Sequence, residues 1–164
     1  DSSENKTGVI CSSFEVLSGL TLGDKKFVQN KKQLVKEILK RLEECAFLEA
    51  NLMLKTHHET GHHLTVISDK ISEKINFFTY QLLDFLDTIT LSKDPNDPLL
   101  KCFYNYCLPL LRKKYPKELM QEIPDHHKKA IIACTIGSHV VYHKGIEWNP
   151  NICDILPLLI AEFK

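Results

Sequence analysis

Residues 64–86, LTVISDKISEKINFFTYQLLDFL, decide the fold class. Apolar residues recur here at three- and four-residue steps, which is the period of one face of an α-helix and not that of a β-strand. The stripe consists of Leu64, Ile67, Ile71, Ile75, Phe78, Leu82, Phe85 and Leu86. Phe77, Leu83 and Ile89 widen it, so we expect this helix to be covered on more than one side or to pack against a partner.

A second long helix is predicted just before this one. Apolar residues between Val28 and Met53 repeat at the same steps, with charged residues in the gaps, and Asp24 is suited to cap the start. We expect this helix to end near Lys55 or Thr56. The two long helices would run antiparallel, because only a short turn joins them.

The turn between these helices, THHETGHH at residues 56–63, has the composition of a metal site but not its spacing. Two ligands on one helix stand at i and i+4. His58 and His62 have that spacing, but they lie on either side of Gly61, a residue suited to end a helix. We therefore predict a polar turn and no metal site.

Proline, glycine and aspartate divide the remainder into shorter helices. Asp97, which precedes a proline, has the pattern of an N-cap, and Pro109 is expected to kink or restart its helix. Gly145 is placed to stop a helix in which Ala133 and Gly137 indicate close packing. The predicted fold is all-α: an irregular bundle of about six or seven helices, two of them long and antiparallel, preceded by a short extended segment.

The composition is that of a globular chain without net charge. Lys plus Arg and Asp plus Glu are 21 each, and hydrophobic residues make up 43% of the 164 residues. Nucleic-acid binding requires a basic excess on one face, and a membrane span requires about 20 consecutive apolar residues, so we expect neither partner. The lysine pairs at 25–26, 31–32 and 128–129 are interpreted as solvated faces.

The six cysteines are interpreted as small apolar residues and not as a disulfide framework. Most stand in apolar runs, as Cys45 and Cys134 do, and there is no C-x-x-C pair. A reducing, cytoplasmic compartment fits this pattern.

Two further features near the C-terminus have ordinary structural interpretations. His139 and His143 stand at i and i+4, but no carboxylate or thiolate of the same helix shares their face. We expect a structural or surface pair, with a general-base role as the alternative. Trp148 is interpreted as an anchor in the last loop.

The first fifteen residues, DSSENKTGVICSSFE, differ in composition from the rest of the chain. Small polar residues lead to Gly8, and Ser12 and Ser13 precede an apolar helical run, which predicts a loop, a tight turn and a helix start. A serine at a helix N-terminus accepts from an unpaired N–H, and such a terminus also suits a carboxylate or phosphate. The plain alternative is a capped helix after a frayed terminus.

Within this stretch, N-x-x-G-V-x-x-S-x-F-E at residues 5–15 resembles the N-x-G-G-V-x-x-S-x-F-E segment of glutamate dehydrogenases. The longer run to residue 20 is similar to that of the large NAD-specific enzymes. Thr7 departs from the pattern, since the smaller enzymes carry a glycine there. The resemblance implies that Val9 and Ser12 line the pocket for the substrate side chain, with the serine donating to the distal carboxylate of glutamate. It also implies that Asn5 lies near the nicotinamide.

The same resemblance implies the C-terminal helical region of an NAD-dependent glutamate dehydrogenase. Residues 1–13 would close the nucleotide-binding domain, and residues 14–164 would form a helical domain. The parent enzyme would convert L-glutamate to 2-oxoglutarate and ammonium with NAD as cofactor. It is expected to be a homo-oligomer in which this chain contacts the remaining domains of the same polypeptide.

The chemistry of such an enzyme is not expected in this chain by itself. No G-x-G-x-x-G follows a predicted strand, and the family's catalytic lysine segment has no counterpart here. We therefore predict no catalytic residue in this chain and no activity from it alone. The alternative function is a stand-alone helical interaction module, supported by the broad apolar face of the helix at residues 64–89.

Overall fold

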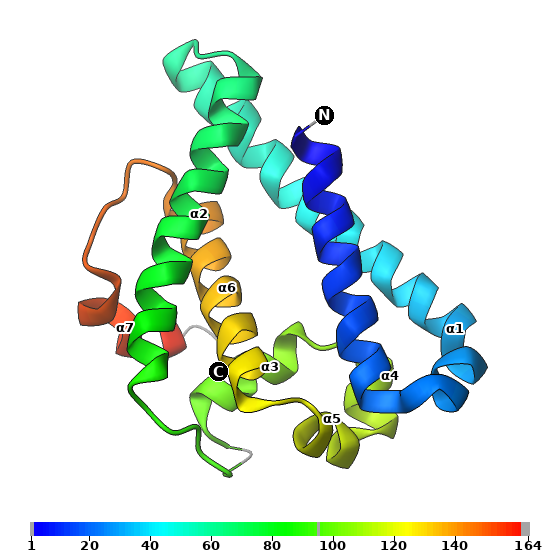
Figure 1. The fold of residues 1–164 in the computed structure, drawn as a ribbon. Coiled ribbons are helices and arrows are strands. Elements are labelled where there is room, and N and C mark those ends of the chain that lie inside the picture. The colour runs from blue at the N-terminus through cyan, green and yellow to red at the C-terminus, as the bar shows by residue number, and fades with distance from the viewer. Residues whose placement is uncertain (1, 95, 162–164) are drawn as a thin grey trace. The chain divides into compact units, whose positions relative to one another are not determined.

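The computed structural model describes residues 2–94 and 96–161, without the side chains of residues 2–7, 153 and 155. Over this part of the chain it contains seven helices and no strand (Figure 1). The chain divides into two compact units, Asp1–Asn51 with Cys107–Pro124, and Leu52–Tyr106 with Asp125–Lys164. The all-α prediction is thus confirmed, and each unit has buried apolar residues of its own.

The first unit is built from most of α1 (Ser2–Thr60), together with α4 (Pro109–Lys114) and α5 (Pro116–Glu122). At Gly23 the backbone leaves helical geometry, with φ 62° and ψ 171°, and α1 folds back on itself (Figure 1). Glycine is suited to this position because it lacks the Cβ that penalises a positive φ. The buried apolar residues of this unit are Phe14, Leu17, Leu22, Leu34, Ile38, Cys107, Leu108, Leu110, Leu111, Leu119 and Ile123.

The start of α1 differs from the prediction. The short extended segment, the turn at Gly8 and the cap at Ser12 or Ser13 are wrong, because the helix already begins at Ser2 and includes these residues. A glycine inside a helix costs only about 1 kcal/mol. Full burial of one large apolar side chain contributes about 1.5–3 kcal/mol, and both Phe14 and Leu17 are buried on this helix. Packing therefore outweighs the local turn signal.

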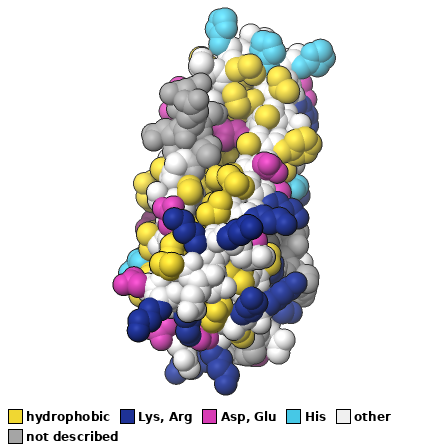
Figure 2. All heavy atoms as spheres, turned by 90° about the vertical axis from the view of Figure 1, so that its right-hand side faces the viewer, with side chains coloured by type: hydrophobic (Ala, Val, Ile, Leu, Met, Phe, Trp, Pro, Cys, Tyr) yellow, Lys and Arg dark blue, Asp and Glu magenta, His cyan; other side chains and the backbone are white. Residues whose placement is uncertain are grey.

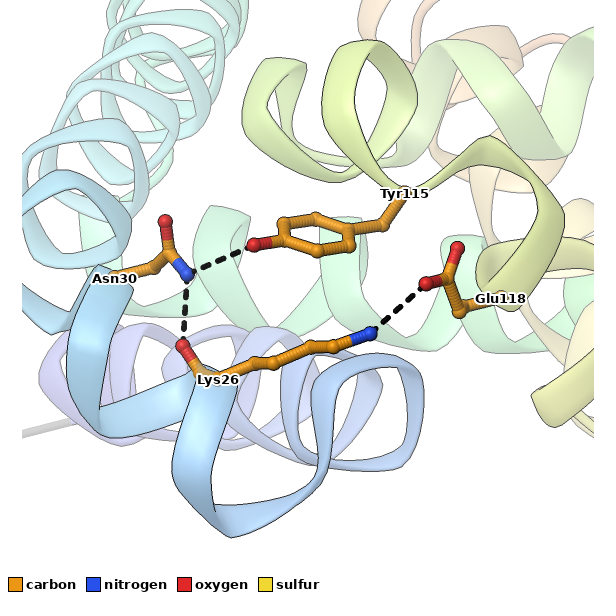
Figure 3. A network of polar contacts seen from close by, with 4 residues as sticks. All are labelled: Lys26, Asn30, Tyr115 and Glu118. Atoms are coloured by element: carbon orange, nitrogen blue, oxygen red, sulfur yellow. Dashed lines mark hydrogen bonds and ion pairs between the residues drawn. The ribbon is translucent and has the colours of Figure 1, made fainter.

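Polar side chains connect α1 to the segment of α4 and α5 within the first unit (Figure 3). Lys26 Nζ lies 3.0 Å from Glu118 Oε1 and 5.2 Å from the ring centre of Tyr115. Asn30 Nδ2 donates to Tyr115 Oη at 3.2 Å and to the Lys26 carbonyl oxygen at 2.8 Å. Interpreting Lys26 only as part of a solvated face is thus incomplete, since its ammonium group holds a carboxylate of another helix.

The second unit consists of the end of α1 with α2 (Leu64–Asp87), α3 (Pro98–Tyr106), α6 (Asp125–Lys144) and α7 (Ile152–Ala161). Its main contact is between α2 and α6. A Cβ at Gly137 of α6 would lie 2.8 Å from Thr79 Oγ1 and 3.3 Å from the carbonyl oxygen of Ile75, both on α2. The close helix packing predicted at Gly137 is confirmed.

The apolar stripe predicted for α2 supplies much of the core of the second unit. Leu64 and Phe85 stay exposed at its edges. The buried apolar residues of this unit are Leu52, Ile67, Ile71, Phe78, Leu82, Leu86, Leu91, Leu100, Cys102, Phe103, Ile132, Ala133, Ile136, Val140, Val141, Ile152, Leu156 and Leu159.

The signals for helix ends hold in most places. Gly61 follows the last residue of α1 with φ 71°, and Gly145 follows the last residue of α6 with φ 86°. Asp97 Oδ1 accepts from two backbone N–H groups in the first turn of α3, at 2.9 and 3.3 Å, and so caps that helix as predicted. α3 ends at Tyr106 and α4 begins at Pro109, so this proline restarts a helix, one of the two outcomes predicted for it.

Lys128 contradicts the interpretation of the lysine pairs as solvated faces. It is buried, and its ammonium group lies 3.0 Å from Asp125 Oδ1 in the first turn of α6. A lysine stem is apolar, so it can be covered by neighbours while its charged end reaches a carboxylate.

Candidate functional site

The three residues that the sequence singled out occupy one face of α1. Positions 5, 9 and 12 are separated by four and three residues, so they follow one another along a helix. Val16 and Leu20 continue the same line. We call Val9, Ser12, Val16 and Leu20 the outer face of α1. The side chain of Asn5 lies outside the described residues, so only its position in the helix is known.

The outer face is open to solvent. Val9 is 67% exposed, Val16 is 54% exposed and Leu20 is 41% exposed, and Ser12 is exposed as well. On the opposite side of the same helix, Phe14 and Leu17 are buried. This arm of α1 therefore buries one apolar side and leaves a second apolar side uncovered.

Charged residues are scarce along this arm. Between Gly8 and Gly23 the one charged residue is Glu15. Glu15 precedes Val16, so it lies about 100° away around the helix, on the flank of the outer face. The outer face itself is a line of aliphatic side chains with the Ser12 hydroxyl among them. The outer face can therefore offer a ligand apolar contact and one hydroxyl, but another part of a protein would have to close a pocket over it, because ligand pockets are concave.

The helical backbone limits what this face can do. Because Ser12 lies well inside α1, the N–H groups around it belong to the helix and are not the unpaired donors of a helix start. The anion site predicted from an N-terminus here is therefore wrong, and a ligand can be held only through side chains. Ser12 can supply a hydrogen bond and Val9 apolar contact, whereas neither supplies a proton-transfer group.

The histidine-rich turn lies at the end of α1 and is exposed. His57 Nδ1 lies 2.7 Å from the carbonyl oxygen of His62, and Thr60 Oγ1 donates to the carbonyl oxygen of Thr56 at 2.7 Å. The first contact spans the turn at Gly61, which is polar and exposed as the sequence predicts, and the second lies within the last turn of α1. Figure 2 shows histidine side chains gathered at one end of the face that it draws. Among the residues that the structure describes, no group of three or more His, Cys, Asp or Glu is arranged to hold a metal ion.

The second histidine pair is a local feature of α6. The rings of His139 and His143 stack with their centres 4.1 Å apart, and His143 Nδ1 lies 2.8 Å from the carbonyl oxygen of His139. Trp148 packs edge-on against Phe78 of α2, with ring centres 6.2 Å apart. The tryptophan thus anchors the last loop, as predicted.

None of the five cysteines whose side chains the structure describes forms a disulfide: Cys11, Cys45, Cys102, Cys107 and Cys134. Burial raises the pKa of Cys102 and of Cys107 to about 12, and it is also the main cause of the raised pKa of Cys45. A thiol with a raised pKa is a poor nucleophile. Cys134 is exposed, so its place in an apolar run does not by itself bury the thiol.

No helix in the described part of the chain is both long enough and apolar enough to cross a membrane.

Known proteins similar to this chain are glutamate dehydrogenases. Glutamate dehydrogenase 2 of Dictyostelium discoideum is 29% identical over 162 residues. The NAD-specific glutamate dehydrogenases of Saccharomyces cerevisiae and Neurospora crassa are 29% identical over 170 residues and 30% identical over 159 residues. No protein-family model matches the chain, and no solved structure does.

The extent of these matches differs between the chain and its relatives. They cover 91%, 91% and 88% of this chain, but the chain spans only 15% of the length of each relative. The similarity therefore extends over most of the helical chain. Over most of its length, the chain is similar to one segment of glutamate dehydrogenases, two of which are NAD-specific, and this confirms the resemblance to that family.

Proposed function

We propose that this chain is a helical region of an NAD-dependent glutamate dehydrogenase and that the outer face of α1 forms a wall of its substrate pocket. The parent enzyme would convert L-glutamate, NAD and water to 2-oxoglutarate, ammonium and NADH. The observation that carries this proposal is the similarity over 88–91% of the chain. A motif shared by chance would match the opening residues alone, so a stand-alone interaction module is not favoured.

In this proposal each residue of the motif has a limited task. The Ser12 hydroxyl donates to the distal carboxylate of glutamate, Val9 contacts the methylene groups of the substrate, and Asn5 lies near the nicotinamide. NAD carries the hydride chemistry, and this chain contributes positioning. The exposure of Val9 and Ser12 supports these roles, because both side chains are open to a ligand.

Ser12 cannot hold the substrate by itself. A carboxylate carries a full charge and accepts several hydrogen bonds, whereas a hydroxyl donates only one. The outer face contains no cation, and its flank carries the acidic Glu15. The compensating positive charge must therefore come from another part of the parent enzyme, which is consistent with an isolated chain that lacks activity.

The domain division belongs to the same proposal. Residues 1–13 would close the nucleotide-binding domain, and residues 14–164 would form the helical domain. The backbone of α1 is helical on both sides of this boundary, so one continuous helix would connect the pocket with the helical region. We further propose that the parent enzyme is a homo-oligomer and that it lies in the cytoplasm, a reducing compartment in which cysteines without disulfides, like those described here, are expected.

The test compares the parent polypeptide with and without this region. We expect glutamate-dependent NADH formation from the complete polypeptide and none from the 164-residue chain alone. Deletion of the region should abolish or strongly weaken glutamate turnover. Turnover by the isolated chain, or undiminished turnover after the deletion, would contradict the proposed function.

A further inference from the structure

The outer face of α1 extends beyond the two residues that have a proposed substrate role. Val16 and Leu20 follow Ser12 at four and eight residues, and both are exposed. Gly8 and Gly19 lie along one flank of this line, and a Cβ at either position would meet nothing within 4 Å. The surface is therefore aliphatic along the line itself and low along this flank, where the exposed Glu15 is its one charged neighbour between Gly8 and Gly23.

Val28, on the second arm of α1, provides a comparison within the same helix. It is 69% exposed, like the valines of the outer face. The residues three and four positions on either side of it are all charged and exposed: Asp24, Lys25, Lys31 and Lys32. Val28 thus lies on a solvated surface, where charged side chains surround a single apolar one.

The surroundings of Val16 are different. The residues three and four positions on either side of it are Ser12, Ser13, Gly19 and Leu20, none of which is charged. Single exposed apolar residues are normal, but a contiguous apolar surface without charges is typical of an interaction site. The two valines are similar in exposure, so their surroundings are what distinguishes them.

We propose that Val16 and Leu20 dock against the part of the parent polypeptide that holds the substrate; this inference rests on the proposed function. The helix is unbroken from Val9 to Leu20, and one turn advances only about 5.4 Å. A domain of the parent polypeptide that holds glutamate against Ser12 would therefore also contact Val16, one helical turn further on. The relatives are long enough to contain such a domain, because the matched segment is only 15% of their length. Its docking surface would be apolar where it meets Val16 and Leu20 and polar where it meets Glu15, and it would approach closely at Gly8 and Gly19.

The test places a charge at each of the two valines of α1. In the parent polypeptide, Val16→Lys forces an ammonium group into the docking surface, where burial without a partner is unfavourable. We expect the KM for glutamate to rise about tenfold or more, the change that ~1.4 kcal/mol produces, and the melting temperature to fall. The matched control, Val28→Lys, should leave both unchanged. In the 164-residue chain alone, Val16→Lys should leave the melting temperature unchanged, because Val16 is already exposed there.

The outcomes separate this inference from the proposed function. If Ser12→Ala raises the KM for glutamate while Val16→Lys behaves like Val28→Lys, the docking surface is refuted and the substrate role stands. If Val16→Lys acts as expected while Ser12→Ala leaves the KM unchanged, the docking surface stands and the substrate role fails. A second copy of the chain is the occupant if the 164-residue chain sediments as a dimer that Val16→Lys dissociates; that result overturns the inference.

Discussion

Replacement of Gly137 by alanine tests the closest helix contact of the second unit. A Cβ at this position would lie 2.8 Å from Thr79 Oγ1, 3.2 Å from the Thr79 nitrogen and 3.3 Å from the Ile75 carbonyl oxygen. The last two atoms belong to the backbone of α2, so they cannot move without shifting that helix. Added volume in a packed interior costs about 1–3 kcal/mol.

Helix propensity acts in the opposite direction at this position. Alanine is favoured over glycine inside a helix by about 1 kcal/mol. Because a 2.8 Å contact forces a neighbouring atom to shift, we take the packing cost as about 2–3 kcal/mol and expect Gly137→Ala to lower the free energy of unfolding by a net ~1–2 kcal/mol. For a chain of this size that corresponds to a fall in melting temperature of about 2–8 °C.

The chain offers a matched control in α1. Gly19 is also inside a helix, but a Cβ there would meet nothing within 4 Å. Gly19→Ala should therefore show the propensity gain alone and raise the free energy of unfolding by about 0.5–1 kcal/mol. Thermal melts and urea titrations of both variants measure the difference.

A second substitution locates the source of the strain. Thr79 Oγ1 is buried without a hydrogen-bond partner, so Thr79→Ala removes the nearest atom without breaking a hydrogen bond. Part of the stability lost in Gly137→Ala should return in the double variant, because the two backbone contacts remain. A Gly137→Ala variant that melts at or above the temperature of the wild type would refute the close packing of α2 and α6.

Three further predictions concern single side chains. Asp97→Ala removes the cap of α3 and should lower the free energy of unfolding by about 1 kcal/mol; an unchanged urea midpoint would contradict the cap. Because burial raises the pKa of Cys102 to about 12, alkylation at pH 8 followed by mass spectrometry should label the exposed Cys134 first, and equal labelling rates would count against that burial. The hydrogen bond from Lys26 lowers the pKa of Glu118. The contact therefore stabilises the fold slightly above the usual carboxyl pKa, and this stabilisation is lost as the pH falls through the lowered pKa. NMR titration should show the Glu118 midpoint rising in Lys26→Met, and an unmoved midpoint would exclude the contact.

Much of the fold follows from local sequence signals. The helical period of residues 64–86 predicts α2, whose ends differ from the prediction by only a few residues. Gly61, Gly145 and Pro109 mark helix boundaries because their backbone preferences apply in almost any surroundings. Signals of this kind are contained in a few neighbouring residues, so one sequence is sufficient to use them.

The errors arise where distant packing overrides a local signal. Gly8 and Ser12 suggest a turn and a cap, but burial of Phe14 on the other side of the helix favours continuous α1. Lys26 and Glu118 are separated by 92 residues, and no local pattern can indicate that they meet. The burial of Lys128 likewise depends on neighbours that local sequence does not specify.

Within the sequence, only the motif at residues 5–15 identifies Val9 and Ser12 as candidate site residues. Period and composition identify neither Val9 nor Ser12 as functional, since an exposed valine and serine are ordinary on a helix. The structure adds that positions 5, 9 and 12 share one helix face and that Val16 and Leu20 continue it. That arrangement follows only once residues 2–22 are known to be helical.

The most direct test of the substrate role is the kinetics of Ser12→Ala in the parent enzyme. Loss of one hydrogen bond to a charged group costs roughly 1.5–3 kcal/mol, so the KM for glutamate should rise by about ten- to a hundredfold. The KM for NAD should change little, because the cofactor phosphates are bound elsewhere. Since Ser12 lies inside α1 and is not a cap, the melting temperature should not fall. An unchanged KM for glutamate would contradict the proposal that the outer face of α1 holds the substrate.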